Sequence, residues 1–272
     1  MIQFLSFTSG SCGNCCYLGL APDGPLGRTH GILIDAGVSL RRMRKDLLDN
    51  GLDFKCIDAV LVTHDHLDHI RHLGSYCKRL RVPVYTTPQL HEALLLHTFT
   101  RDWIAPCRKD LQEGEWLEVA EDISVRYFEV PHDATQTVGF AIRIGGHRFV
   151  LMTDLGRMTE EALDFARQAD TVVIESNFDV DMLLGGSYPY ELKMRICKGA
   201  GHLSNDACAE AVGRFWHPGL RNLFLCHLSE HNNTPQKALQ ATSERLRSLG
   251  VKPGETALRI MPRYFATPLF IL

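Results

Sequence analysis

A predicted buried strand followed at once by four metal-ligating side chains constrains this chain more than any other feature. Residues 59–63 (AVLVT) are apolar and mostly branched, which is typical of a short strand in a sheet interior. His64, His66, Asp68 and His69 follow within six residues, so the end of a rigid strand would present them together. Imidazoles combined with a carboxylate suit zinc, manganese or iron better than calcium or magnesium. The pattern therefore predicts a transition-metal site, whereas the alternative is a solvated loop that happens to be rich in histidine.

The same arrangement recurs along the chain. Apolar runs at residues 32–34, 123–129, 149–152 and 223–226 each predict a strand that ends at or just before a polar residue. These polar residues are Asp35, His132, Asp154 and His227. Together with the H-x-H-x-D-H run at 64–69, these strand ends resemble, in number and order, the five motifs of the metallo-β-lactamase superfamily.

This resemblance implies two divalent ions, with zinc as the first expectation and manganese or iron as alternatives. The implied ligands are His64, His66 and His132 for one ion, Asp68, His69 and His227 for the other, and Asp154 as a bridge. Asp35 is expected to orient these ligands. An acid at Asp154 and a histidine at His66 favour hydrolysis over oxygen reduction.

Two further segments indicate how a leaving group would be protonated. Glu175 lies in an apolar run at 172–178, and His202 precedes a predicted helix for which Ser204 is an N-cap. Both resemble residues that transfer-RNA 3′-processing endonucleases of this superfamily use to protonate a leaving oxygen. We therefore take Asp68, Glu175 and His202 as candidate catalytic residues. In the alternative interpretation, Glu175 pairs with a basic residue and His202 is a surface residue at a helix start.

Segments near both ends resemble the YycJ/WalJ-type bacterial exonucleases of this superfamily, which act on DNA. These segments are residues 8–14 (TSGSCGN) and 227–235 (HLSEHNNTP). The resemblance implies a 5′→3′ DNA exonuclease whose partner is a nucleic acid.

Four polar residues in these segments are candidate substrate contacts, namely Ser11, Asn14, Asn232 and Asn233. The Gly/Ser-rich segment at 8–14 could receive a phosphate on its backbone amides, or it could be only a tight hairpin connection. The two later asparagines could line the rim of the site, or they could simply precede a helix capped by Thr234.

The periodicity predicts strands that alternate with helices in a single domain over residues 1–272. The resemblance to the metallo-β-lactamase superfamily implies an α/β fold, a four-layer αβ/βα sandwich, which accommodates this order. Strands are expected at 2–6 and 16–20, and successive antiparallel strands at 115–119, 123–129, 139–144 and 147–152, with a two-residue turn at Gly145 and Gly146. Helices are expected at 39–50, 88–97, 159–166, 204–215 and 234–249. The first helix should bury one face, formed by Leu40, Met43, Leu47 and Leu48.

Composition limits the remaining possibilities. The net charge of −3 gives no general attraction to nucleic acid, although basic clusters occur at 41–45, at 78–81 and at Lys193, Arg195 and Lys198. The nine cysteines are scattered, which is typical of reduced thiols, and no signal or membrane-spanning segment is evident. We therefore expect a cytoplasmic protein that does not bind a membrane.

The sequence thus predicts a metal-dependent phosphodiesterase, with two alternatives. One is a hydrolase of a small thioester, lactone or cyclic phosphodiester, although thioesters and lactones need less help from a pair such as Glu175 and His202. The other is a non-catalytic metal-binding protein that holds DNA or a partner, which the complete ligand set disfavours.

Overall fold

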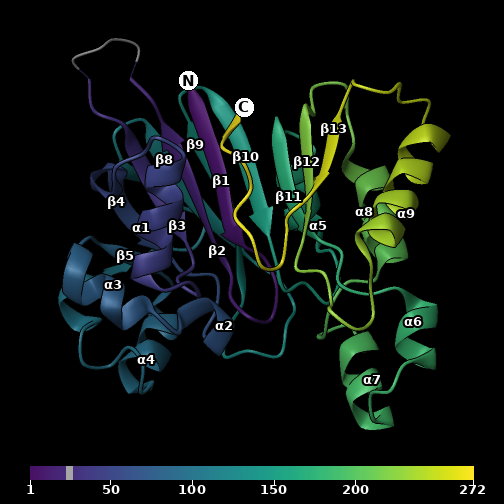
Figure 1. Ribbon diagram of the computed structural model, residues 1–272, viewed down its shortest axis with the longest axis horizontal. Coiled ribbons are helices and arrows are strands. Elements are labelled where there is room, and N and C mark those ends of the chain that lie inside the picture. Colours follow the sequence, from purple (N-terminus) through teal and green to yellow (C-terminus); the bar gives the residue numbers. More distant parts are fainter. Residues whose placement is uncertain (23–26) are drawn as a thin grey trace.

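Two seven-stranded β-sheets lie face to face, with helices on their outer faces (Figure 1). The computed structural model describes residues 1–22 and 27–272. The arrangement confirms the predicted four-layer αβ/βα sandwich. The two ends of the chain meet in the first sheet, because β14 pairs with β1 in antiparallel register.

Each sheet is part antiparallel and part parallel. The first has the strand order β14-β1-β2-β3-β4-β5-β6 and becomes parallel from β3 onward. Its strands are β1 (Ile2–Thr8), β2 (Cys15–Leu20), β3 (His30–Ile34), β4 (Ile57–Leu61), β5 (Val84–Thr86), β6 (Arg108–Asp110) and β14 (Phe270–Ile271). The second has the order β13-β12-β11-β10-β9-β8-β7 and is parallel from β10 to β13. Its strands are β7 (Leu117–Ala120), β8 (Ile123–Glu129), β9 (Val138–Ile144), β10 (His147–Met152), β11 (Thr171–Glu175), β12 (Asn222–Cys226) and β13 (Ala257–Ile260).

The five helices expected from the sequence are present, and each starts at a side-chain cap. The cap oxygen accepts a hydrogen bond from the backbone N–H three residues later, which satisfies a donor that the first turn leaves free. The caps are Ser39, Thr87, Thr159, Ser204 and Thr234. The helices are α1 (Leu40–Asp49), α4 (Pro88–Leu96), α5 (Glu160–Ala166), α8 (Asn205–Phe215) and α9 (Pro235–Ser248). Shorter helical segments are α2 (Leu67–Ile70), α3 (Leu73–Leu80), α6 (Val180–Gly185), α7 (Tyr190–Cys197) and the 3₁₀ turns η1 (Phe54–Cys56) and η2 (Ala105–Cys107).

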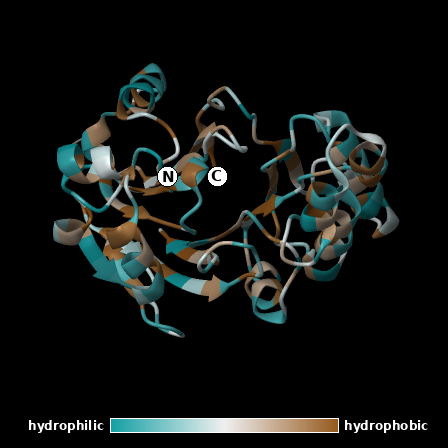
Figure 2. Cartoon of the chain, turned by 90° about the horizontal axis from the view of Figure 1, so that it is seen from below, coloured by the Kyte–Doolittle hydropathy of each residue, from teal (hydrophilic) through white to brown (hydrophobic). Residues whose placement is uncertain are grey.

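Three apolar layers hold the sandwich together. Between the sheets, the ring of Phe4 lies 5.3 Å from that of Phe149 and 4.9 Å from that of Phe224, measured between centroids. A second layer joins the first sheet to α1 through Met43 and Leu47, and a third joins the second sheet to α5, α8 and α9. Figure 2 shows hydrophobic residues along the inner strands and hydrophilic residues on the outer helices. Burial of apolar area in these layers is the main stabilising contribution.

Two local predictions are wrong. The sequence places Leu48 on the buried face of α1, but this side chain is 61% exposed. It lies about 100° around the helix from the buried Leu47. The strand expected at 115–119 begins later, at Leu117, since the N–H of Glu115 still bonds within the preceding turn.

The turn between β9 and β10 agrees with the sequence. Gly145 and Gly146 have φ values of 50° and 81°. Positive φ at both central residues matches the twist of a hairpin, and glycine adopts it without a steric penalty.

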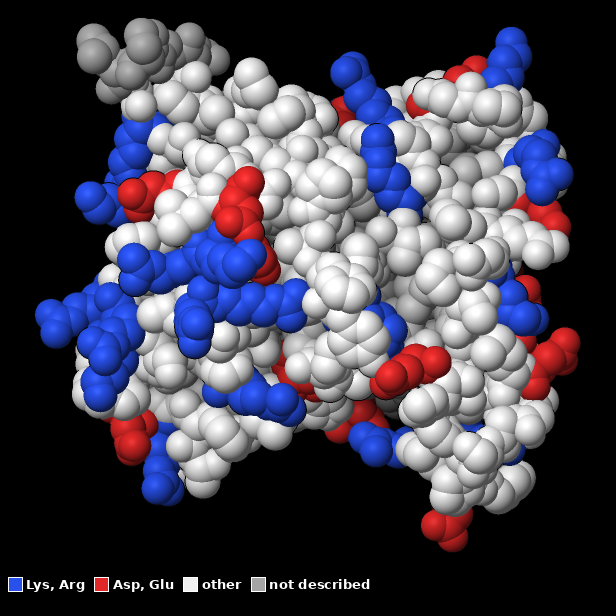
Figure 3. Space-filling view, viewed as in Figure 1, with Lys and Arg blue, Asp and Glu red and all other residues white. Residues whose placement is uncertain are grey.

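Basic side chains are densest around α1 on the face shown in Figure 3. Arg41, Arg44 and Lys45 are exposed on α1, and Figure 3 shows lysine and arginine concentrated around this helix. The basic residues at 78–81 lie at the end of α3, and those at 193–198 lie on or just after α7. Within residues 1–22 and 27–272, no helix is long and apolar enough to cross a membrane.

Candidate metal centre

The predicted polar residues meet where the parallel strands of both sheets end. Asp35 follows β3, His64 lies three residues after β4, and His227 follows β12. The carboxyl ends of neighbouring parallel strands lie at one edge of a sheet, which is the usual place for a site in such folds. The two sheets bring their edges together here, so residues far apart in sequence share one centre.

Three residues of this centre have left-handed backbone conformations. Asp35, Asp154 and His227 have φ values of 63°, 51° and 53°. Such values are uncommon for residues other than glycine, and they persist only where surrounding contacts hold them. The backbone is closely packed beside Asp35, because a Cβ on Gly37 would lie 1.9 Å from the carbonyl oxygen of Asp68.

One cluster contains His64, His66 and His132, whose candidate ligand atoms lie within 4.8 Å of one another. Nδ1 of His132 donates a hydrogen bond of 2.7 Å to the carbonyl oxygen of Gly201, and its Nε2 lies 3.3 Å from Nδ1 of His66. A ring nitrogen that is hydrogen-bonded in this way leaves the other nitrogen free to bind an ion.

A second cluster contains Asp68, His69 and His227, again within 4.8 Å of one another. Nδ1 of His69 lies 2.7 Å from Oδ2 of Asp35, and both side chains are buried. Asp35 therefore holds the ring of His69 with Nε2 toward the centre, the orienting contact expected from the sequence.

Asp154 lies between the two clusters. Its Oδ2 is 3.1 Å from Nε2 of His69, and its Oδ1 is 3.8 Å from Nε2 of His132. One carboxylate therefore reaches both sets of histidines, an arrangement suited to a bridge.

Two buried nitrogens test whether the residues fit a metal. Nε2 of His64 and Nε2 of His227 are buried and have no hydrogen-bond partner among the described residues. A buried polar atom without a partner is costly, so each is better explained as a ligand position than as a packing residue.

The charges around the clusters also favour a cation. Burial alone would lower the pKa of His227, but Asp154 and two further carboxylates raise it to about 10. Burial and the neighbouring His69 hold the pKa of His64 well below its usual value, which keeps that imidazole in the neutral form that binds metals. The buried His/Asp clusters are therefore consistent with a dinuclear metal site.

Glu175 connects the predicted catalytic histidine to the metal clusters. Its Oε1 lies 2.7 Å from Nδ1 of His202 and 3.0 Å from Nδ1 of His227, while its Oε2 accepts hydrogen bonds from the backbone N–H groups of Leu155 and Leu203. Burial would raise the pKa of Glu175, but the imidazoles bring it down to about 2. The same contact raises the pKa of His202, against the lowering effect of its own burial. The sequence indicated the pair with His202, but not the contact with His227.

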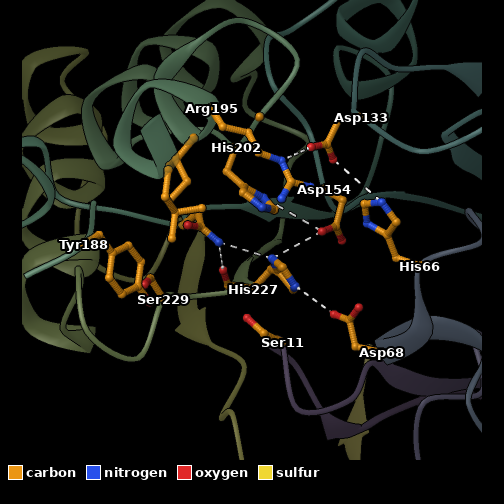
Figure 4. Close-up of a pocket in the computed structure, with 14 residues that line it drawn as sticks. Ser11, His66, Asp68, Asp133, Asp154, Tyr188, Arg195, His202, His227 and Ser229 are labelled. Carbon is orange, nitrogen blue, oxygen red and sulfur yellow. Dashed lines mark hydrogen bonds and ion pairs between the residues drawn. The ribbon is translucent and has the colours of Figure 1, made fainter. Parts of the chain in front are cut away.

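A cavity of about 250 Å³ opens above these residues (Figure 4). His66, Asp68, Asp154, His202 and His227 line it, so both clusters and the predicted acid face one space. The remaining walls include residues that were not among the predicted site residues, namely Asp133, Asn177, Tyr188, Leu192, Arg195 and Ile196. Two of them carried a signal in the sequence, because Asp133 directly follows His132 and Arg195 belongs to the basic cluster at 193–198.

The four candidate substrate contacts are placed differently from one another. Ser11 is exposed and lines the cavity. Asn14 is buried, and its amide donates a hydrogen bond of 3.0 Å to Oδ2 of Asp68, so it supports a ligand candidate from behind. Asn232 and Asn233 are also buried, and the amide of Asn233 donates to two backbone carbonyls. Their placement agrees with the alternative in which they precede the helix capped by Thr234.

Comparisons with known proteins agree with this geometry. A model of the β-lactamase superfamily domain matches residues 30–227. The chain is 30% identical to exodeoxyribonuclease YycJ of Bacillus anthracis over 256 residues, 93% of this chain and 92% of that protein. It is 31% identical to exodeoxyribonuclease WalJ of Streptococcus pneumoniae serotype 2 over 236 residues, 87% and 85% of the two chains. The crystal structure of the metallo-β-lactamase fold protein YhfI from Bacillus subtilis superposes with a TM-score of 0.69 at 17% identity, covering 98% of this chain and 99% of that one.

Proposed function

Because the chain belongs to the metallo-β-lactamase superfamily, we propose that its His/Asp centre makes it a dinuclear metal-dependent phosphodiesterase, and specifically a 5′→3′ DNA exonuclease. The observation that carries the proposal is that members of both clusters and His202, which Glu175 holds from behind, line one cavity. A phosphodiesterase needs both parts, since it must stabilise an anionic phosphate and protonate a leaving alkoxide.

Two divalent ions, zinc first and manganese or iron as alternatives, would be held by seven residues of this chain. Those residues are His64, His66, Asp68, His69, His132, Asp154 and His227. When bound, a pair of such ions lowers the pKa of bound water and neutralises phosphate charge. Asp35 and Asn14 would keep their neighbouring ligands oriented.

His202 would serve as the acid for the leaving oxygen. Its Nδ1 faces Glu175, which leaves Nε2 available on the cavity side. The carboxylate stabilises the protonated imidazole, so Nε2 can hold a proton and pass it to the departing alkoxide. Thioesters and lactones gain less from such a pair, because their leaving groups need less protonation.

DNA as substrate and cleavage at a chain end are supported by the two exodeoxyribonucleases that are about 30% identical to this chain over most of its length. The 5′→3′ direction rests on the resemblance of residues 8–14 and 227–235 to the YycJ/WalJ-type exonucleases. A small cavity of about 250 Å³ also suits a chain end better than an uninterrupted duplex.

The direct test is to incubate metal-loaded protein with single- and double-stranded DNA and RNA, labelled at the 5′ or the 3′ end. A 5′→3′ exonuclease releases the 5′ label at once as a mononucleotide, whereas the 3′-labelled strand shortens progressively. Chelator-treated protein and the Asp154→Ala variant serve as controls. Turnover of a thioester or a lactone without cleavage of any phosphodiester would reject the proposal, and so would DNA binding without turnover.

A further inference from the structure

The helix α7 (Tyr190–Cys197) is amphipathic, but none of its residues is buried. Leu192 and Ile196 are half-buried and line the cavity, together with Tyr188 just before the helix. A helix normally packs its apolar face against the core. The apolar face of α7 instead borders the candidate active site.

Hydrogen bonds nevertheless hold α7 to the segments before and after it. Nζ of Lys193 donates hydrogen bonds of 2.7 Å to the carbonyl oxygens of Leu184 and Gly186 in and just after α6. At the other end, the backbone N–H of His202 donates to the carbonyl oxygen of Ile196 at 3.0 Å. The apolar wall is therefore held in register with the proposed catalytic histidine.

The cavity thus has two chemically different sides. In the view of Figure 4, Tyr188 lies on one side and His66 and Asp133 lie on the other. The polar side carries the candidate metal ligands, which suit a phosphate, whereas the α7 side offers an aromatic ring and two aliphatic side chains. A nucleotide has the same division, since an anionic phosphate is joined to a flat base with an apolar face.

Resting on the proposed function, we infer that Tyr188, Leu192 and Ile196 form a binding wall for the nucleobase beside the scissile phosphate. Tyr188 would stack on the base, and the two aliphatic side chains would cover its edge or the sugar. Stacking on an aromatic ring tolerates every base, which is what a nuclease without sequence preference requires.

The charge at the same helix fits this occupant. Arg195 lines the cavity and pairs with Asp133, and its side chain remains 62% exposed. A partly exposed guanidinium can contact a second phosphate while it keeps its carboxylate partner. An uncharged apolar ligand would offer no anion to the exposed part of this guanidinium.

The test uses three phosphodiesters with one leaving group: the 5′- and 3′-(p-nitrophenyl phosphate) esters of thymidine, and methyl p-nitrophenyl phosphate, which has no base. The Tyr188→Ala variant should lower the ratio of kcat/KM for the better thymidine ester to that for the methyl ester by about 5- to 100-fold, mainly through KM. Tyr188→Phe should restore the wild-type ratio, since stacking needs the ring and not the hydroxyl. Tyr190→Ala is the matched control, because Tyr190 is 74% exposed and does not line the cavity.

An equal loss on all three esters would leave the ratio unchanged and would mean that Tyr188 only supports the fold. Wild-type kcat/KM on all three esters would mean that the base binds elsewhere. Either result overturns the inference. If the wild-type protein cleaved no phosphodiester, the proposed function would fail by itself. Calorimetric titration with thymidine 5′-monophosphate would then test the wall separately. Binding that is lost in Tyr188→Ala and kept in Tyr190→Ala supports the wall, and absence of binding to the wild-type protein overturns it.

Discussion

Replacing Glu175 with glutamine tests two roles of one carboxylate, its contact with His202 and its contact with His227. Oε2 of Glu175 accepts from two backbone N–H groups, which are obligatory donors. The glutamine carbonyl would therefore keep that position, and its NH₂ group would face Nδ1 of His202 and Nδ1 of His227. Each ring would then have to present an unprotonated Nδ1, which places its proton on Nε2.

For His227, that tautomer blocks Nε2, the buried nitrogen that we propose as a metal ligand. The variant must therefore lose either the hydrogen bond or the ion. A hydrogen bond to a charged group contributes about 1.5–3 kcal/mol, which corresponds to a metal affinity roughly 10- to 100-fold weaker.

For His202, loss of the carboxylate removes the charge that raises the pKa of the imidazole. At saturating metal and neutral pH, cleavage of a dinucleotide should slow by about 10²-fold, whereas a p-nitrophenyl ester should be much less affected. The variant should thus show two defects, a weaker metal affinity and a stronger dependence on the leaving group.

Competition with a chromophoric chelator measures the first defect, and kcat on the two substrates measures the second. Asp35→Asn is the matched control, because Asp35 orients only His69 among the site histidines. It should weaken metal binding and leave the ratio of the two kcat values unchanged. Wild-type metal affinity in Glu175→Gln would refute the role of Glu175 in holding His227.

Three further predictions follow from the same contacts. Protein purified without chelator should hold about two metal ions per chain by elemental analysis, and Asp154→Ala should lose metal together with activity; full activity at one ion per chain would contradict the dinuclear site. His202→Ala should keep its metal, yet cleave substrates with poor leaving groups about 10²-fold or more slowly; an equal effect on good leaving groups would exclude the role as an acid. Asn233→Ala removes a donor from the carbonyls of Ser176 and Asn177, of which the second keeps the N–H of Ser229, and also breaks the bonds to Asn205; it should lower the free energy of unfolding by about 2–4 kcal/mol in urea titrations, whereas a change in KM at wild-type stability would instead favour a substrate contact.

The secondary structure was largely predictable because its signals are local. Caps such as Ser39 and Thr234 bond to an N–H three residues away, and the glycine pair at 145–146 determines its own turn. Some strands that the sequence did not indicate depend on a neighbouring segment. Strands of three residues such as β5 and β6 are too short to show a period, and only their parallel partners establish them.

The candidate metal ligands were predictable for a related reason. A polar side chain directly after a buried strand is placed by that strand, and parallel strands end at a common edge. Because five such strand ends follow the order of the metallo-β-lactamase motifs, the resemblance named the candidate ligands, and the structure places these residues close together.

Tertiary structure alone decided how those residues contact one another. Glu175 reaches His202 and His227, which are 27 and 52 residues further along the chain, because β11 lies beside β12 and the start of α8 lies at the end of both strands. No sequence motif indicates the wall formed by Tyr188, Leu192 and Ile196. Any short amphipathic helix has the same pattern, and the pattern does not show that its apolar face borders a cavity. Hydrogen bonds and cavities depend on distances of about 3 Å between segments remote in sequence, and only the packing of the two sheets sets those distances.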